Sequence, residues 1–171
     1  MKLILMMAMT LDGIIAKNSN QLADWTSKAD KKAFIAETKK HGVIIMGETT
    51  FKTIGRPLPG RLNLILSMMP EKYADQTIID QLEFFKGEPQ AIIDHLESRG
   101  YESAILGGGA RTNAAFLKEN LVDEVLITVE PKIFGAGLNF TEGQNLDLNL
   151  KLLATKELGD NAVQLRYQVI K

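Results

Sequence analysis

The sequence predicts an α/β fold: a mostly parallel central sheet with helices on both faces and a C-terminal antiparallel hairpin. Short apolar runs, suited to strands buried on both faces, alternate with segments of helical spacing. Two longer runs near the C-terminus are joined around Gly159-Asp-Asn161, which is a hairpin signal. No repeat or linker interrupts the 171 residues, so one domain spanning residues 1–171 is expected.

The first half of the chain reads as strand, helix and strand. Lys2–Met9 is apolar throughout, as expected of a buried strand, and Ile14–Ala16 continues it after a turn. Ser27–Lys40 has helical spacing and ends before Gly42, because glycine is favoured just past a helix C-terminus. The next buried strands, separated by a short helix and a tight turn, are expected at Val43–Met46 and Leu62–Leu66.

The second half alternates in the same way. Glu88–Arg99 and Asn113–Lys118 have helical spacing, and Gly100 ends the first of these helices. Ser103–Leu106 and Glu124–Val129 are apolar runs of strand length. Short strands are also expected at Ile78–Ile79 and Glu83–Phe85, and the strands of the closing hairpin at Leu150–Glu157 and Val163–Ile170.

Composition narrows the functional class. Apolar residues make up 45% and charged residues 24%, the formal net charge is −1, and no long basic run occurs, which argues against nucleic acid as a partner. The absence of cysteine excludes disulfides, a thiolate nucleophile and cysteine-ligated zinc. His41 and His95 lack metal-ligand spacing, so no metal site is expected. No apolar stretch is long enough to span a bilayer, and a soluble cytoplasmic protein without a membrane partner is expected.

A stiff turn, Gly55-Arg-Pro-Leu-Pro-Gly-Arg61, separates two predicted strands. Proline locks φ and glycine permits positive φ, so Arg56 and Arg61 are expected as fixed cations beside a strand-end crevice. A structural turn with solvated arginines is the alternative. With Val43-Ile-Ile-Met-Gly47 before it and Ile65-Leu-Ser67 after it, the unbroken motif resembles the dihydrofolate reductase family, in which such a turn links the cofactor site to the folate site.

A glycine loop follows the predicted strand Ser103–Leu106. Gly107, Gly108 and Gly109 precede a helix, and free backbone amides at a helix start can bind a phosphate or pyrophosphate. A tight structural turn would look the same, and neither the Rossmann nor the Walker pattern is met. In dihydrofolate reductases, however, a late strand ending in Gly-Gly contacts the pyrophosphate of the nicotinamide cofactor, and this resemblance implies the same role here.

Asp30 is the one acid that we assign to catalysis. Ser27 followed by Asp30 also fits a capping box, in which each side chain binds a free amide of the helix start. In dihydrofolate reductases an acid stands five residues after a tryptophan and four before a phenylalanine, and Asp30 has this spacing from Trp25 and Phe34. A partly buried carboxylate can favour the protonated form of an amino-heterocycle, and Phe34 is then expected to stack against that ring.

Two related families share the resemblance. Residues 43–67 resemble dihydrofolate reductase, whereas both ends are similar to the reductase domain of bacterial riboflavin biosynthesis. The similar segments are Ala8-Met-Thr-Leu-Asp-Gly13, Trp25-Thr-Ser27, Asn113-Ala-Ala115, Leu121-Val-Asp-Glu124 and Phe134-Gly-Ala-Gly137. That domain is often fused to a zinc deaminase, but this sequence contains no cysteine and therefore lacks the cysteine ligands of such a zinc site.

The resemblance implies an NADPH-dependent oxidoreductase that acts on a C=N bond or on a sugar carbonyl or imine group. A dihydrofolate reductase-like enzyme is the first expectation, and a reductase of 5-amino-6-(5-phosphoribosylamino)uracil type is the alternative. A nucleotide-binding protein without turnover is the non-enzyme alternative. A homodimer is expected because the riboflavin-pathway reductase pairs through its sheet edge.

The same resemblance assigns the site residues. The substrate-binding residues beside the catalytic Asp30 are Met6, Ala8, Phe34, Arg61 and Thr128. The cofactor-binding residues are Ala8, Ile15, Gly47, Thr49, Thr50, Leu66, Ser67, Gly107, Gly108, Gly109 and Arg111. Glu48 and Met68 stand where family members carry basic residues for the adenosine 2′-phosphate, so a weakened preference for NADPH over NADH is expected. Arg111 or Lys52 is an alternative source of the missing charge.

Overall fold

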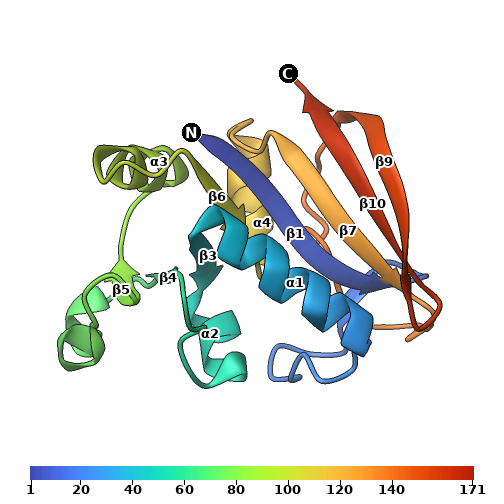
Figure 1. Ribbon diagram of the computed structural model, residues 1–171, viewed down its shortest axis with the longest axis horizontal. Coiled ribbons are helices and arrows are strands. Elements are labelled where there is room, and N and C mark those ends of the chain that lie inside the picture. Colours follow the sequence, from blue (N-terminus) through green and yellow to red (C-terminus); the bar gives the residue numbers. More distant parts are fainter.

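The computed structural model describes residues 1–171, and its centre is an eight-stranded sheet (Figure 1). The strand order is β5-β4-β3-β6-β1-β7-β10-β9, and β5 through β7 in this order run parallel. Strands β10 and β9 form the antiparallel end of the sheet. The strands of this sheet are β1 (Lys2–Thr10), β3 (Val43–Gly47), β4 (Leu62–Leu66), β5 (Leu82–Phe85), β6 (Ser103–Leu106), β7 (Glu124–Glu130), β9 (Asn149–Gly159) and β10 (Ala162–Ile170).

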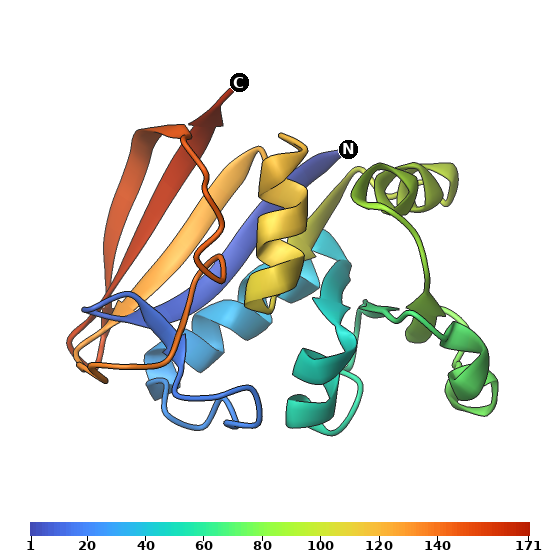
Figure 2. The same cartoon turned by 180° about the vertical axis from the view of Figure 1, so that it is seen from behind.

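Helices cover both faces of the sheet, which confirms the predicted α/β architecture. Helix α1 (Lys28–His41) lies in front of the sheet in Figure 1, whereas α4 (Ala110–Lys118) lies in front of it in Figure 2, seen from behind. The remaining helical segments are α2 (Glu48–Ile54), the 3₁₀ helix η1 (Pro70–Gln76) and α3 (Pro89–Ser98). The longest helix has 14 residues, and none combines the length and apolarity needed to cross a bilayer.

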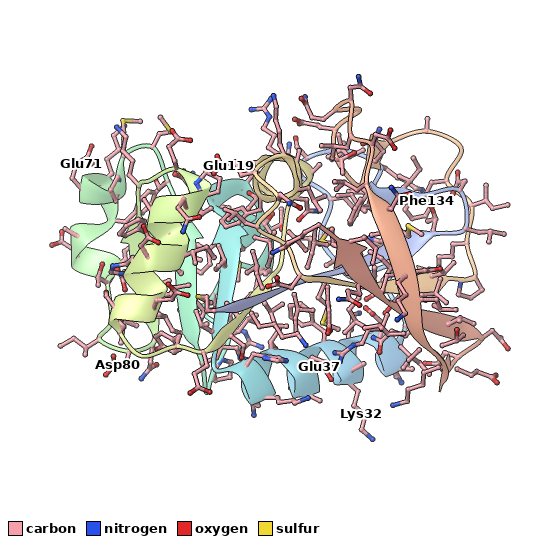
Figure 3. The ribbon with its side chains drawn as sticks, turned by 90° about the horizontal axis from the view of Figure 1, so that it is seen from above. Lys32, Glu37, Glu71, Asp80, Glu119 and Phe134 are labelled. Atoms are coloured by element: carbon pink, nitrogen blue, oxygen red, sulfur yellow. The ribbon has the colours of Figure 1, made fainter.

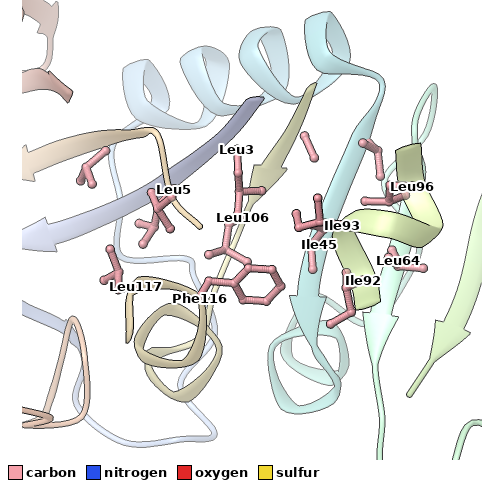
Figure 4. Packing of buried hydrophobic residues seen from close by; sticks show 14 of the residues in the cluster. Leu3, Leu5, Ile45, Leu64, Ile92, Ile93, Leu96, Leu106, Phe116 and Leu117 are labelled. Carbon is pink, nitrogen blue, oxygen red and sulfur yellow. The ribbon is translucent and has the colours of Figure 1, made fainter. Parts of the chain in front are cut away.

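Alternation along the strands divides the core between the two faces. Leu3 and Leu5 of β1 point to the α3 and α4 face, where Phe116 packs against Leu106 and its neighbours (Figure 4). Ile4 and Met6, one residue out of phase, point to the α1 face. Strands such as β1 and β3 supply residues to both clusters, which explains the apolar runs Leu3–Met6 and Val43–Met46.

Helix α1 is bounded as its sequence suggests. Ser27 is the N-cap residue, and its hydroxyl accepts a hydrogen bond from the Asp30 amide at 3.1 Å. Gly42 ends the helix with φ of 73°, a left-handed conformation that favours glycine. Lys32 points away from the sheet in Figure 3, and the helix carries its exposed lysines at positions 28, 31, 32, 39 and 40.

Three local predictions were wrong. Ile78–Ile79 is not a strand: Ile78 forms only an isolated bridge with Leu82, and 87% of Ile79 is exposed. Helix α4 begins at Ala110 rather than Asn113, because the backbone of Gly109 already serves as its N-cap. The prediction also omitted the two-residue strand β8 (Leu138–Asn139), which pairs with β2 (Ile14–Ala16) in a second small sheet.

Candidate functional site

The carboxyl ends of the parallel strands meet at one edge of the sheet, where open α/β sheets bind ligands. Strand β6 is short: its last residue, Leu106, is in register with Leu5, whereas β1 runs on to Thr10 beside β7. The chain therefore leaves the sheet at Gly107 between two longer neighbours. Gly47 and Leu66 are in register at the ends of β3 and β4, and Ala8 and Thr128 are in register near the ends of β1 and β7, so these four assigned residues lie at this edge.

The substrate-side residues lie together on the α1 face. Ala8 is in register with Thr128, and Met6 shares a core cluster against which Phe34 packs. Asp30, on the first turn of α1, is 7% exposed. Burial raises the pKa of Asp30 above its ordinary value of 3.8, with the hydroxyls of Thr128 and Thr26 acting in the opposite direction. The structure thus places a buried, hard-to-ionise carboxyl beside the end of β7.

Glu130 is a second buried carboxylate that the sequence analysis missed. It is 1% exposed at the end of β7, and its Oε1 accepts hydrogen bonds from the amide and the hydroxyl of Ser27 at 2.8 and 2.9 Å. Its negative charge further raises the pKa of Asp30. The capping-box interpretation is therefore half wrong, because the Ser27 amide donates to Glu130 and not to Asp30. The sequence did contain one signal for this residue, because Glu130 directly follows the predicted buried strand Glu124–Val129.

The glycine loop is tied to the end of β3. The Gly47 amide donates to the Gly108 carbonyl at 2.8 Å, and the Gly107 amide donates to Ile45 at the same distance. Gly108 has φ of 91°, a conformation that favours glycine, and a Cβ there would lie 2.8 Å from the sulfur of Met7 and would displace that side chain. Gly109 has an ordinary φ of −75°.

The start of α4 fits the phosphates of a dinucleotide. Its N-cap, Gly109, makes no side-chain capping bond, so the amides of the first turn have no such partner. A Cβ on Gly109 would lie 3.3 Å from the Thr50 hydroxyl, which faces the loop from α2. Asn113, fully buried in this helix, donates to the Phe140 carbonyl but leaves its Oδ1 without a partner.

Glu48 follows Gly47 directly, and three side chains hold it in place. Its carboxylate accepts hydrogen bonds from Lys52 at 2.5 Å, Ser67 at 2.6 Å and Tyr73 at 2.6 Å. These bonds, that of Lys52 first, lower the pKa of Glu48 to about 2. Ser67, which the sequence analysis assigned to the cofactor, thus contacts Glu48, and neither this contact nor that of Tyr73 was predicted.

Of the three arginines considered from the sequence, Arg61 and Arg111 are engaged within the protein, whereas Arg56 is exposed and forms no ion pair. Arg61 is 5% exposed; it donates to the Pro59 carbonyl and to the Thr38 hydroxyl, which leaves two of its N–H groups free. It is thus an enclosed cation, not one presented openly on the turn. Arg111 is exposed on α4, and its Nε donates to Glu142 at 3.0 Å.

The segment between β1 and α1 makes hydrogen-bonding and aromatic contacts with the loop that follows β7. Asp12 accepts hydrogen bonds from the Thr10 hydroxyl at 2.5 Å and from the Gly135 amide at 2.7 Å, and the Thr10 bond contributes most to lowering the pKa of Asp12. The ring of Trp25 packs edge-on against Phe134, with centroids 5.1 Å apart. Ile15, which the sequence analysis assigned to the cofactor, lies in β2, between the contacting residues Asp12 and Trp25 along the chain.

Comparison with known proteins decides the family. Residues 2–144 match the family model described as dihydrofolate reductase. The chain belongs to the dihydrofolate reductase family. It is also similar to the uncharacterized protein YwjB of Bacillus subtilis (strain 168), with 26% identity over 174 residues that cover 97% of each chain.

Solved structures show the dihydrofolate reductase fold in both related branches. A deaminase and 5-amino-6-(5-phosphoribosylamino)uracil reductase from Thermotoga maritima superposes with a TM-score of 0.84 and 18% identity, covering 99% of this chain and 56% of that one. Dihydrofolate reductase from Enterococcus faecalis superposes with a TM-score of 0.72 and 18% identity, covering 99% and 97%. At these identities the similarity establishes the fold alone, and a nicotinamide-dependent reductase is the activity that the dihydrofolate reductase family implies.

Proposed function

We propose that this protein is a nicotinamide-dependent reductase of a pteridine-type heterocycle, with dihydrofolate as the first substrate to test. The observation that carries the proposal is the buried carboxyl of Asp30, next to Thr128, at the same sheet edge as the glycine loop. A protein that only binds a dinucleotide does not need an acid buried on the substrate side. Membership of the family supports the same activity.

Asp30 has the position and the environment for assisting reduction of a C=N bond, which needs a hydride on carbon and a proton on nitrogen. The nicotinamide cofactor, when bound, supplies the hydride. Asp30 would accept hydrogen bonds from the N–H groups of the ring and favour its protonated form, while water delivers the proton. Thr128 would orient the carboxyl, Phe34 would cover the ring, and the free N–H groups of Arg61 would bind an acidic substituent.

The reaction is tested by the loss of absorbance at 340 nm when the protein is mixed with dihydrofolate and either NADPH or NADH. Turnover supports the proposal. Turnover only with 5-amino-6-(5-phosphoribosylamino)uracil would favour the second candidate, which the riboflavin-type motifs at Asn113-Ala-Ala115 and Leu121-Val-Asp-Glu124 support. If the protein binds a dinucleotide but turns over neither substrate, the non-enzyme alternative, a nucleotide-binding protein, would be supported.

Replacing Glu130 by glutamine is expected to lower the pKa of Asp30, because one of the charges that raises it disappears. A rate that requires a proton held between Asp30 and the ring falls as pH rises through that pKa. The fall should therefore occur at a lower pH in the variant, which a pH profile of kcat/KM measures. Glu124→Gln, at the opposite end of β7, is the matched control, and an unshifted profile in Glu130→Gln would contradict the coupling.

A homodimer through the free edge of β9 is also proposed. Strand β9 pairs only with β10, and Leu150, Leu152 and Leu153 are 45%, 53% and 45% exposed along it. Light scattering is expected to give twice the chain mass of 18.9 kDa, and Leu152→Glu to give the monomer. Ile79→Glu, at an exposed site on another part of the surface, should leave the dimer intact. A monomeric wild-type protein at micromolar concentration would contradict the prediction.

A further inference from the structure

Glu48 is a carboxylate fixed at the ligand-binding edge of the sheet. It begins α2 at the end of β3, and Ser67, immediately after β4, donates to its Oε2 at 2.6 Å. Tyr73, on η1, and Lys52, one turn along α2, donate to its Oε1. Three elements thus converge on one acid side chain. Such an arrangement holds the carboxylate in a single orientation, which an unattached surface glutamate does not have.

Glu48 directly follows Gly47, a residue that is hydrogen-bonded to the glycine loop. Gly47 is in register with Leu66 of β4, and its amide donates to the carbonyl of Gly108 at 2.8 Å. A Cβ on Gly47 would lie 3.0 Å from the Thr112 hydroxyl at the start of α4. A dinucleotide with its phosphates at α4 therefore has its adenosine ribose within reach of Glu48 on the β3 and β4 side, where Leu66 and Ser67 end the strand.

The remaining hydrogen-bonding capacity of Glu48 suits a hydroxyl group. An ionised carboxylate offers about four acceptor positions, and the three donors leave one on Oε2. A sugar hydroxyl can donate to that position, as a ribose hydroxyl does to the acidic residue of many NAD sites. A phosphate group has no proton to donate at neutral pH and would meet a fixed negative charge.

The two cations considered from the sequence as partners for a 2′-phosphate, Lys52 and Arg111, are already paired. Lys52 binds Glu48 itself, so the pair carries no net positive charge, and Arg111 binds Glu142. Met68, which follows Ser67, is apolar and 74% exposed. Neither alternative source of positive charge considered from the sequence is free in the structure.

We propose that Glu48 accepts a hydrogen bond from the 2′-hydroxyl of the cofactor's adenosine ribose, so that the protein binds NADH more tightly than NADPH. This inference rests on the proposed nicotinamide-dependent function. It assigns cofactor choice to one residue: the carboxylate accepts the ribose hydroxyl of NADH and repels the 2′-phosphate of NADPH. A difference of at least about tenfold between the two dissociation constants is expected, equivalent to about 1.4 kcal/mol.

Isothermal titration calorimetry of the wild-type protein with NADH and with NADPH measures both dissociation constants without any substrate. Glu48→Gln, which keeps the shape but loses the charge, should remove most of the selectivity, and Glu48→Arg should reverse it in favour of NADPH. Glu71→Gln removes a carboxylate from η1 that takes no part in the cluster, and it should leave the ratio of the two constants unchanged. Circular dichroism confirms that each variant is folded.

Tighter binding of NADPH by the wild-type protein, or an unchanged ratio in Glu48→Gln, would overturn this inference and leave the reductase proposal standing. Failure of the wild-type protein to bind either dinucleotide would overturn both. Selectivity for NADH that Glu48→Gln abolishes and Glu71→Gln retains would support it.

Discussion

Replacing Asp30 by asparagine is expected to lower turnover at neutral pH by roughly a hundredfold or more, the usual scale for losing an acid–base group. The substitution keeps the size of the side chain but removes the ionisable proton and the charge that favours a protonated ring. Steady-state rates with NADPH, NADH and dihydrofolate measure the loss. Asp160→Asn is the matched control, because Asp160 is an exposed acid that binds the Ala29 amide at the same helix start.

The stability of Asp30→Asn at neutral pH should not fall together with its activity. Because burial raises the pKa of Asp30, the folded state resists ionisation of this group. The stability that the protonated group provides is present below its unfolded pKa, near 3.8, and is lost as pH rises through the higher folded value. The amide of asparagine does not ionise, so the variant does not lose stability as pH rises. Its melting temperature at neutral pH should therefore be unchanged or higher than that of the wild-type protein.

These two measurements separate catalysis from capping. The helix cap depends on the Ser27 hydroxyl, which accepts from the Asp30 backbone amide, and that bond survives the substitution. A variant with a lowered melting temperature and full activity per folded molecule would mean that Asp30 is a structural residue. Retained turnover alone would falsify the catalytic assignment.

Adding a side chain at Gly109 is expected to block the dinucleotide. Its φ of −75° is accessible to any residue, and the nearest atom to an added Cβ is the Thr50 hydroxyl at 3.3 Å. The new carbon atoms would occupy the space between the loop and α2 in which the phosphates are proposed to bind. Gly109→Ala should weaken binding at least tenfold, and the bulkier Gly109→Val by about a hundredfold, or about 2.7 kcal/mol.

The choice of Gly109 over Gly108 matters for this experiment. At Gly108 the positive φ and the contact with Met7 would strain the fold itself, so lost binding there would not identify a ligand site. Ala115→Val adds volume on an exposed position of α4 and controls for a general effect on this helix. Unchanged affinity in Gly109→Val, with a normal melting temperature, would remove the glycine loop from the cofactor site.

Local sequence patterns predicted the parts of the fold whose causes are local. The strands are recognisable because burial on both faces demands unbroken apolar runs such as Val43–Met46. The segment Pro70–Gln76 has no apolar periodicity, and its 3₁₀ conformation could not be read from it. The first turn of α4 was missed because its cap is a glycine without a side chain to signal it.

Long-range partners limited the prediction of the site. Ser27 and Asp30 form a plausible local pair, but the Ser27 amide binds Glu130, 103 residues away, and no local pattern contains that competitor. Glu48 was recognised as an unusual acid beside a cofactor site. Its anchoring by Tyr73 depends on η1, an element that was not predicted.

The central place of β1 bears on how the chain folds. Lys2 pairs with Ser103 and Ile4 with Glu124, so both sheet partners of β1 follow it by about a hundred residues along the chain. Contacts of such high sequence separation slow folding, because loop closure must precede the pairing that stabilises it. Until Ser103–Leu106 and Glu124–Glu130 have been synthesised, the apolar strand β1 therefore has neither of its two sheet neighbours, and its exposed apolar surface favours aggregation.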